Sequence, residues 1–291
     1  MQNFKDQTEI YQTYIEQYLS DNCFVYPSAP QKILFDSMRY SLLAGGKRLR
    51  PIFVFDFCRM CGGDWHKAVP FAAAIEMIHT YSLIHDDLPC MDNDDYRRGM
   101  LTNHKVYGEA LAVLAGDGLL TAAFSFIAKS DFSSDIRIQA VEILSKCAGE
   151  LGMVGGQVLD MQSEQRRCTK QEVLDIQSRK TGALICCACM LGVLAANGDE
   201  LKLSSAADFA SNIGLAFQIR DDMLDVIGSA EELGKAVGVD ANKNTFVQLY
   251  GIEKCDEMVK AHTAQAIACL RRFENTEYMI ELSNFLTSRT V

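Results

Sequence analysis

The stretch HTYSLIHDDLPCMDNDDYRRG, residues 79–99, places five aspartates within ten positions and ends with two adjacent arginines before a glycine. Carboxylates this close repel one another, so the cluster destabilises a fold unless water or a cation lies between them. A solvated acidic loop is one interpretation of these charges, and a cation site is another. An EF-hand calcium loop does not fit, because Tyr96 stands at its fifth position and Arg97 replaces the glycine at its sixth.

The first half of this stretch has the spacing of a helix. His79, Ser82 and Asp86 are three and four residues apart and share one face, with His79 about 10 Å along the axis from Asp86. Pro89 ends the regular helix. A turn, and not helical register, therefore places Asp92.

The same helical spacing continues along most of the chain, as at Phe209, Ile213 and Phe217. The stretch PIFVFDFC, residues 51–58, is apolar enough for a strand, but proline at a first helical position favours a helix. The sequence predicts an all-α fold, a helical bundle around a central cavity. With only 5 prolines and no Gly/Ser/Pro-rich linker, residues 1–291 are expected to form one domain. The predicted helices span 3–20, 31–43, 51–60, 68–88, 109–128, 135–149, 151–163, 171–178, 182–196, 205–227, 245–270 and 277–287.

Charge and composition limit the partners. The formal net charge of −10 argues against nucleic acid. The N-terminal residues mix acidic and polar groups where a signal peptide needs an apolar core. The longest uncharged apolar run, residues 183–196, is too short to span a bilayer and predicts a helix buried on most sides. Together with 11 cysteines read as reduced thiols, these features predict a cytoplasmic protein without stable membrane insertion.

A second acidic cluster lies in QIRDDMLD, residues 218–225. We expect its helix to begin at Ser205, with Asp208 in a capping-box position, and to run to Gly228. Oxygen ligands without histidine or cysteine suit a hard cation, and Mg²⁺ takes carboxylates, waters and substrate phosphates. The two clusters together predict a Mg²⁺ site through which an acidic protein can bind a diphosphate. On one side of the helix stand Gln218, Asp221, Asp222 and Asp225.

Positive charge comes from GGKRLRP, residues 45–51, where Lys47, Arg48 and Arg50 precede a predicted helix. Backbone N–H groups and basic side chains there can hold phosphate oxygens, although an ordinary surface loop has the same composition. Arg97 and Arg98 also have two interpretations, as phosphate contacts or as neutralising partners of the aspartates before them.

Four motifs in order resemble those of the trans-prenyl diphosphate synthases. They are GGKRLRP, DDxxxxD followed by RRG (residues 86–99), GxxxGQxxD (residues 152–160) and DDxxD (residues 221–225). The similarity runs over nearly the whole chain. Within that family it is greatest to the bacterial farnesyl diphosphate synthases, whose first aspartate motif has the two-residue insertion seen here.

The resemblance implies a role for each acidic residue. Asp86 and Asp92 would hold two Mg²⁺ ions and Asp221 a third. The outer part of the metal shell would come from Asp87, Asp222 and Asp225.

The resemblance also divides the basic residues between two substrates. The allylic diphosphate would meet Arg97, Lys180 and Lys235, with Thr181 and Gln218 beside the allylic cation. Isopentenyl diphosphate, which binds without metal, would lie against Lys47, Arg50, His79 and Arg98. The family's lysine in K-[ST]-T is displaced here, because GVDANKNT puts Lys243 only three residues after Asp240.

The implied reaction is a head-to-tail (1′-4) condensation of isopentenyl diphosphate with dimethylallyl or geranyl diphosphate, giving farnesyl diphosphate (C15) and pyrophosphate. Tyr81, with Ser82 beside it, would limit chain length, and the geranylgeranyl product (C20) is the alternative. A terpene cyclase would carry N-D-x-x-S-x-x-x-E as its second metal motif, which residues 221–225 lack. A non-catalytic synthase subunit typically loses an acidic motif, and this chain has both. The resemblance also implies a homodimer.

Overall fold

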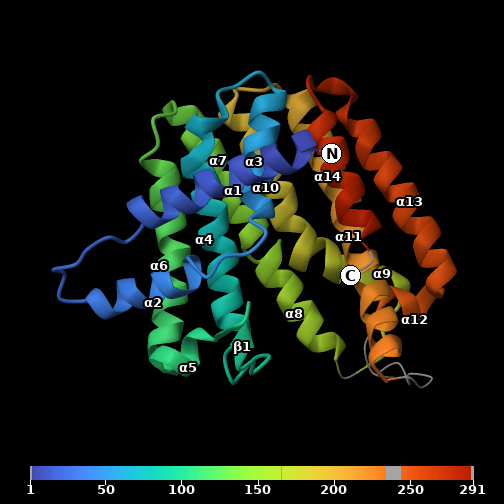
Figure 1. Ribbon diagram of the computed structural model, residues 1–291, viewed down its shortest axis with the longest axis horizontal. Coiled ribbons are helices and arrows are strands. Elements are labelled where there is room, and N and C mark those ends of the chain that lie inside the picture. Colours follow the sequence, from blue (N-terminus) through green and yellow to red (C-terminus); the bar gives the residue numbers. More distant parts are fainter. Residues whose placement is uncertain (1, 165, 234–243, 290–291) are drawn as a thin grey trace.

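The computed structural model describes residues 2–164, 166–233 and 244–289, and most of these residues are helical (Figure 1). The predicted all-α fold is confirmed. The helices are α1 Gln2–Asn22, α2 Lys32–Leu42, α3 Leu49–Met60, α4 Val69–Asp86, α5 Asn103–Tyr107, α6 Glu109–Ala128, α7 Ser134–Ala148, α8 Met153–Ser163, α9 Lys170–Gln177, α10 Ala183–Ala195, α11 Glu200–Leu233, α12 Phe246–Tyr250, α13 Ile252–Cys269 and α14 Glu277–Ser288. Short 3-10 helices span Trp65–Ala68 and Leu270–Arg272.

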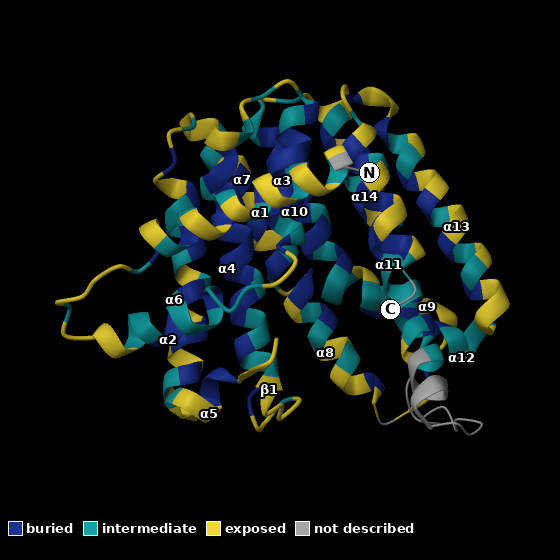
Figure 2. Ribbon diagram, in the orientation of Figure 1, coloured by how far each residue is buried: buried dark blue, intermediate teal, exposed yellow. Residues whose placement is uncertain are grey.

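The main hydrophobic core surrounds α3, α4 and α10, which Figure 2 shows as the most buried part of the molecule. Helix α4 packs along α6, and α10 packs against α3, α7 and α11. Most of the side chains of α10 are buried, as the apolar run 183–196 predicted. Burial of apolar surface on this scale is the main force that holds such a bundle together.

A smaller hydrophobic cluster surrounds the second half of α11. Ile219 and Met223 of α11 pack with Phe246 of α12 and Val259 of α13, and all four are buried. Asp221 and Asp222 lie between the first two of these residues. Apolar side chains on both sides thus fix the part of α11 that carries the second aspartate motif.

Several helix boundaries differ from the sequence prediction. The stretch 51–58 is helical in α3, as expected, but α11 begins at Glu200 and not at Ser205. Asp199 caps it, since its Oδ1 accepts a hydrogen bond from the Lys202 amide at 2.8 Å, so the capping role predicted for Asp208 is wrong. The predicted helix 245–270 is broken between α12 and α13 at Gly251, whose φ of 77° no regular helix accommodates.

Two features were not predicted. After Pro89 the chain forms a hairpin of β1 Tyr96–Arg97 and antiparallel β2 Met100–Leu101, followed by α5. Between α9 and α10 the predicted break is instead a π-helical turn, Ser178–Gly182. Insertion of one extra residue into a helix in this way is frequent at functional sites, because it changes the direction of the side chains that follow.

Two helical stretches have the length and apolar composition of a membrane-crossing helix, namely α6 and the continuous helix Lys170–Ala195. The apolar window of the second is 50% buried and that of α6 is 33% buried. Helix α6 is therefore unusual in this fold, because it is strongly apolar and yet much of its surface is not covered by other helices.

Candidate functional site

The first aspartate motif lies at the lower end of the bundle in Figure 1, where α4 ends and leads into the hairpin. The Asp92 amide donates a hydrogen bond of 2.8 Å to the Asp86 carbonyl, so the turn after Pro89 folds Asp92 back onto the helix end. Burial raises the pKa of Asp86 to about 6; the Lys180 ammonium opposes this and the Asp92 carboxylate adds to it. The predicted turn is confirmed, and burial contributes more to this shift than the neighbouring acidic groups do.

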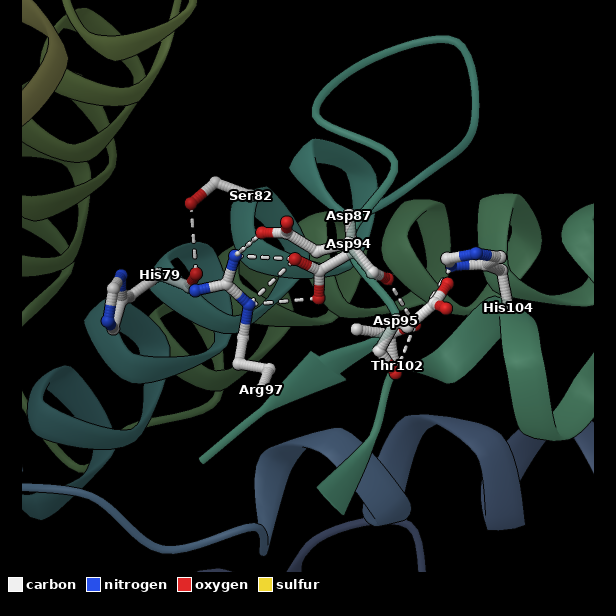
Figure 3. Close-up of polar contacts among 8 residues, drawn as sticks. All are labelled: His79, Ser82, Asp87, Asp94, Asp95, Arg97, Thr102 and His104. Carbon is white, nitrogen blue, oxygen red and sulfur yellow. Dashed lines mark hydrogen bonds and ion pairs between the residues drawn. The ribbon is translucent and has the colours of Figure 1, made fainter. Parts of the chain in front are cut away.

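Arg97 of β1 lies between two carboxylates of the acidic stretch (Figure 3). Its Nε is 2.7 Å and 2.9 Å from the two carboxylate oxygens of buried Asp87, and its Nη2 is 3.6 Å from Asp94. The Thr102 hydroxyl donates to the Asp94 carbonyl at 2.7 Å and so holds the backbone of this loop. Arg97 therefore neutralises the acidic stretch, which is one of the two interpretations that the sequence allowed.

Arg98 takes a different direction from its neighbour. Its Nη1 donates to the carbonyl of Gly45, and its guanidinium packs on Gly46, where a Cβ would lie 2.7 Å from Cζ. The hairpin and the loop before α3 therefore touch through Arg98. Asp95 is paired instead with Lys105, at 2.7 Å.

Arg50, His79 and Arg98 act electrostatically on one another beside this contact, and this group of basic side chains is called the basic recess below. Burial lowers the pKa of Arg50 to about 10, opposed by Glu76, and Arg98 lowers it further. The pKa of His79 lies well below its usual value because of burial and then the charges of Arg50 and Arg98. The Nε of Arg50 is buried and has no hydrogen-bond partner among the described residues. Buried donors of this kind are usually satisfied, so the recess has the character of an anion site.

Arg48, from the same loop, is a structural residue. Its Nη1 lies 2.6 Å from Glu76 of α4, and both side chains are almost completely buried. Removing either partner would leave an uncompensated buried charge. The GGKRLRP motif thus contains one arginine that fixes α3 to α4 and one, Arg50, that lines the recess.

The second aspartate motif lies on α11, whose end reaches the same side of the molecule as the end of α4, with α8 between them in the view of Figure 1. The Asp221 carboxylate accepts a hydrogen bond from the guanidinium of Arg289, which also lies 4.3 Å from the ring centre of Phe217. Asp222 accepts from the Phe246 amide at 2.7 Å and so also holds α12. Burial raises the pKa of Asp221; the Arg289 guanidinium and, after it, the Lys47 ammonium oppose this rise.

The π-helical turn carries Lys180 and Thr181. The Lys180 ammonium lies 2.6 Å from Asp160 of α8 and acts electrostatically on Asp86. Thr181 and Arg50 line one small apolar cavity of about 40 Å³ together with Phe217. The turn therefore directs Lys180 toward the acidic side chains and Thr181 toward Arg50 of the basic recess.

The acidic side chains of the two aspartate motifs are oxygen donors of the kind that Mg²⁺ prefers. Three acidic, histidine or cysteine side chains do not converge as a ready-made metal site anywhere in the described part of the chain. Asp86 at the end of α4, Asp92 in the turn that follows and Asp221 within the second half of α11 are oxygen donors, and Asp221 already binds a cationic group, that of Arg289. This arrangement fits Mg²⁺ held by one or two carboxylates, with waters and substrate phosphates completing its shell.

The predicted acidic residues thus lie at the end of α4, in the turn after it and in the second half of α11, and their assignment as a site stays a prediction. Lys235 and Lys243 lie outside the described residues. Tyr81 is buried in α4, and the Ser82 hydroxyl, half-buried, donates to the His79 carbonyl at 2.9 Å (Figure 3).

Sequence reasoning missed two charged residues at this site. Asp160 belongs to the GxxxGQxxD motif, which signalled it without giving it a role. Arg289 has no sequence signal, because nothing in TSRTV marks a contact with α11.

The all-α fold and the two aspartate motifs are those of the isoprenyl diphosphate synthases. The chain belongs to the polyprenyl synthetase family, whose model matches residues 31–284. It is 48% identical over 235 residues to a farnesyl diphosphate synthase of Bacillus subtilis, with 79% of each chain covered. It is 43% identical over 269 residues to a geranylgeranyl diphosphate synthase of Cyanophora paradoxa, with 90% of each covered.

Solved structures give the same family. A FPP/GFPP synthase from Zymomonas mobilis superimposes with a TM-score of 0.89 at 35% identity, covering 98% of this chain and 99% of that one. A geranylgeranyl pyrophosphate synthetase from Pyrococcus horikoshii gives a TM-score of 0.86 at 29% identity, with 98% of each chain covered.

Proposed function

We propose that this protein is a Mg²⁺-dependent prenyltransferase that condenses isopentenyl diphosphate with dimethylallyl or geranyl diphosphate to give farnesyl diphosphate and pyrophosphate. The observation that carries the proposal is the pairing of two acidic motifs, at the end of α4 and in the second half of α11, with a basic group in which a buried Arg50 nitrogen has no hydrogen-bond partner among the described residues. The acidic motifs suit a diphosphate bound through metal ions, and the basic recess suits a diphosphate bound without metal.

The acidic part would hold the allylic diphosphate. Three Mg²⁺ ions would be bound by Asp86, Asp92 and Asp221, with Asp87, Asp222 and Asp225 in support, and they would supply the positive charge that stabilises the departing pyrophosphate. Lys180 is positioned by Asp160 to contact the same group. Arg97 can reach it only by leaving its ion pair with Asp87.

The basic recess would hold isopentenyl diphosphate. Arg50 and Arg98 stay charged at neutral pH even with lowered pKa values, whereas the depressed pKa of His79 keeps its ring neutral there. A neutral imidazole can donate one hydrogen bond to a phosphate oxygen. Lys47 is exposed at the edge of the recess.

The reaction needs no protein nucleophile. The allylic C–O bond breaks, its electron pair leaves with pyrophosphate, and an allylic cation remains. The double bond of isopentenyl diphosphate attacks this cation to form the new C–C bond, and pyrophosphate takes the proton that is lost. Thr181 and Gln218 would present oxygen atoms to the cation, and the apolar side chains nearby keep out water that would trap it as an alcohol.

We assign the C15 product because Tyr81, five residues before Asp86, fills space beside the first aspartate motif. Its ring is 6% exposed, so the ring is held by the core. A relative of each product class is similar to this chain, and the geranylgeranyl product (C20) remains the second candidate.

We also propose a homodimer formed through α6. One face of this helix packs on α4, whereas Val113 and Leu114 on its other side are 39% and 54% exposed. Val106 of α5, a helix that contacts α6, is also exposed, at 44%. An apolar face of this kind is typical of an interface between subunits. Sedimentation of the wild type as a dimer and of Leu114→Asp as a monomer would support this assembly.

The remaining parts of the proposal concern the chain as a whole. We propose one synthase domain over residues 1–291, in line with the 98% of the chain that matches solved relatives. A cytoplasmic location is supported by 11 cysteines that are all free. The acidic net charge is unfavourable for binding nucleic acid, and burial of α10 in the bundle is unfavourable for membrane insertion.

The direct test is incubation of the purified protein with isopentenyl and dimethylallyl diphosphates and Mg²⁺, followed by analysis of product chain length. Formation of C15 diphosphate and pyrophosphate is expected. Absence of any prenyl product would overturn the proposal, and a C20 product would replace the first candidate with the second.

A further inference from the structure

The side chain of His85 bridges α4 and α6. Its Nε2 lies 3.1 Å from the carbonyl oxygen of Val113. A carbonyl oxygen can only accept a hydrogen bond, so Nε2 must carry the hydrogen. This contact fixes the imidazole ring against the backbone of α6, one residue before the first aspartate motif begins at Asp86.

Gly116 of α6 provides the surface on which this ring lies. A Cβ at Gly116 would lie 2.0 Å from Nε2 of His85 and 2.5 Å from its Cδ2. Contacts this short are not possible, so any larger residue at position 116 must displace the imidazole. Because the backbone of α6 lies on one side of the ring, displacement must move the ring away from α6 and back toward α4.

On α4, the neighbour of His85 is Tyr81. The two rings meet edge to face with their centres 5.7 Å apart and their planes at 76°. They are four residues apart and so lie on the same side of the helix. Tyr81 is almost completely buried and has little room to retreat. Gly116, His85 and Tyr81 thus form a continuous row of contacts from α6 to the proposed end of the product pocket.

We propose that His85 is a positioning residue that holds the Tyr81 ring in place, and that Gly116 of α6 is a further determinant of how long a prenyl chain the enzyme makes. This inference rests on the proposed function, in which the growing apolar tail stops at Tyr81. The substrate tail meets Tyr81, whereas His85 and Gly116 act through it.

The two positions have opposite effects on chain length. His85→Ala removes the support, so the Tyr81 ring gains freedom to move aside and the pocket deepens. Gly116→Ala pushes the imidazole toward Tyr81, and the pocket becomes shallower. In the double variant the methyl group at position 116 meets no imidazole, so the product should follow His85→Ala.

The test measures product chain length from isopentenyl and dimethylallyl diphosphates for each variant, with the folded state checked by thermal melting. The C20 share should rise about tenfold in His85→Ala, and the C10 share about tenfold in Gly116→Ala. The double variant should lengthen the product and also recover the melting temperature that Gly116→Ala loses. Gly118→Ala is the matched control on α6, because its Cβ would meet only the flexible thioether of Met38, at 3.0 Å; this variant should still make C15.

Tyr81→Ala separates the possible failures. If it lengthens the product while His85→Ala leaves it unchanged, or if Gly116→Ala gives an unchanged or longer product, the role of His85 and Gly116 is overturned. If Tyr81→Ala itself leaves C15 unchanged, the end of the pocket is wrongly assigned, and the inference fails with it. If the wild type makes no prenyl product, the proposed function is what has failed.

Discussion

Gly156 of α8 packs directly against the backbone of Lys180, so closely that a Cβ at Gly156 would lie 2.3 Å from the Lys180 nitrogen and 2.7 Å from its Cα. Asp160, one helical turn further along α8, binds the ammonium group of the same lysine. One face of α8 thus fixes both ends of Lys180. The GxxxGQxxD motif is explained in part by this contact, since a larger residue at Gly156 cannot fit.

We therefore expect Gly156→Ala and Asp160→Asn each to lower kcat/KM for dimethylallyl diphosphate by about tenfold, because a small misplacement of a diphosphate contact is costly. Gly182→Ala is the control in the same π-helical turn, since its Cβ would meet only a carbonyl oxygen at 3.6 Å. Steady-state kinetics with each substrate varied in turn gives the measurement. An equal loss in Gly182→Ala would contradict a specific role for Gly156.

The sequence predicts the parts of the fold that depend on residues close together in the chain, and it misses the parts that depend on residues far apart. The helices follow from local spacing of apolar residues, and α3 was predicted correctly because a proline stands in its first turn. The π-helical turn was not predictable, because it depends on how closely α8 approaches through Gly156. The start of α11 was missed because Asp199 and Ser205 are both acceptable caps, and tertiary packing favours the first.

The site shows the same limit. The aspartates were found because like charges concentrated in a short stretch are a local signal. The Arg289 contact with Asp221 joins residues 68 positions apart, and no periodicity reports such a pair. Arg48 and Arg50 are similar in sequence context, yet only the structure shows that Arg48 is paired with Glu76 in the core.

Our metal prediction is that Asp86→Ala or Asp221→Ala lowers turnover by about a hundredfold or more while the helical fold remains. Each change removes a carboxylate proposed to bind Mg²⁺, and Asp221→Ala also removes the partner of Arg289. Asp95→Ala is the control within the same acidic stretch, since Asp95 is exposed and pairs with Lys105. Chelation with EDTA should abolish product formation, and added Mg²⁺ should restore it. Near-normal turnover by either metal variant at saturating substrate would rule out the assignment.

The basic recess gives a separate prediction. Arg50→Ala or Lys47→Ala should raise KM for isopentenyl diphosphate by about tenfold and leave KM for the allylic diphosphate much less changed. Kinetics with each substrate varied in turn distinguishes the two. An equal change for both substrates would mean that the basic residues are wrongly divided.

Arg48→Ala should behave differently from Arg50→Ala. It leaves Glu76 buried without its partner, so we expect a loss of about 3–5 kcal/mol in the free energy of unfolding. Denaturant titration gives this value. An unchanged stability together with a raised KM for isopentenyl diphosphate would show that Arg48 is a substrate contact and not a structural residue.

The raised pKa of Asp86 predicts how stability depends on pH in the metal-free protein. Its value in the fold, about 6, exceeds the ordinary 3.8, so the folded state binds more protons between these values and stability rises as pH falls through 6. Asp86→Asn is neutral at every pH. It should therefore melt higher than the wild type near pH 7.5 in EDTA, and the difference should shrink as pH falls below 6 and close near the ordinary pKa of 3.8. If the difference in melting temperature between Asp86→Asn and the wild type did not change with pH, the raised pKa of Asp86 would be contradicted.

The last prediction concerns product length. If the diphosphate is fixed at Asp86 and Asp92, the growing tail runs along α4 toward its N-terminal end, and Ser82 lies one turn, about 6 Å, along that path. Tyr81→Ala should open space for a further isoprene unit and give C20 or longer products, whereas Ser82→Phe should fill the path and favour C10. A purely structural Tyr81, buried with a pKa raised to about 12 by that burial, predicts instead a lower melting temperature and unchanged C15 product. Chain-length analysis of the products together with thermal melts decides between these outcomes, and a wild-type product of C20 would place the end of the pocket deeper, near Met77 or Ile78.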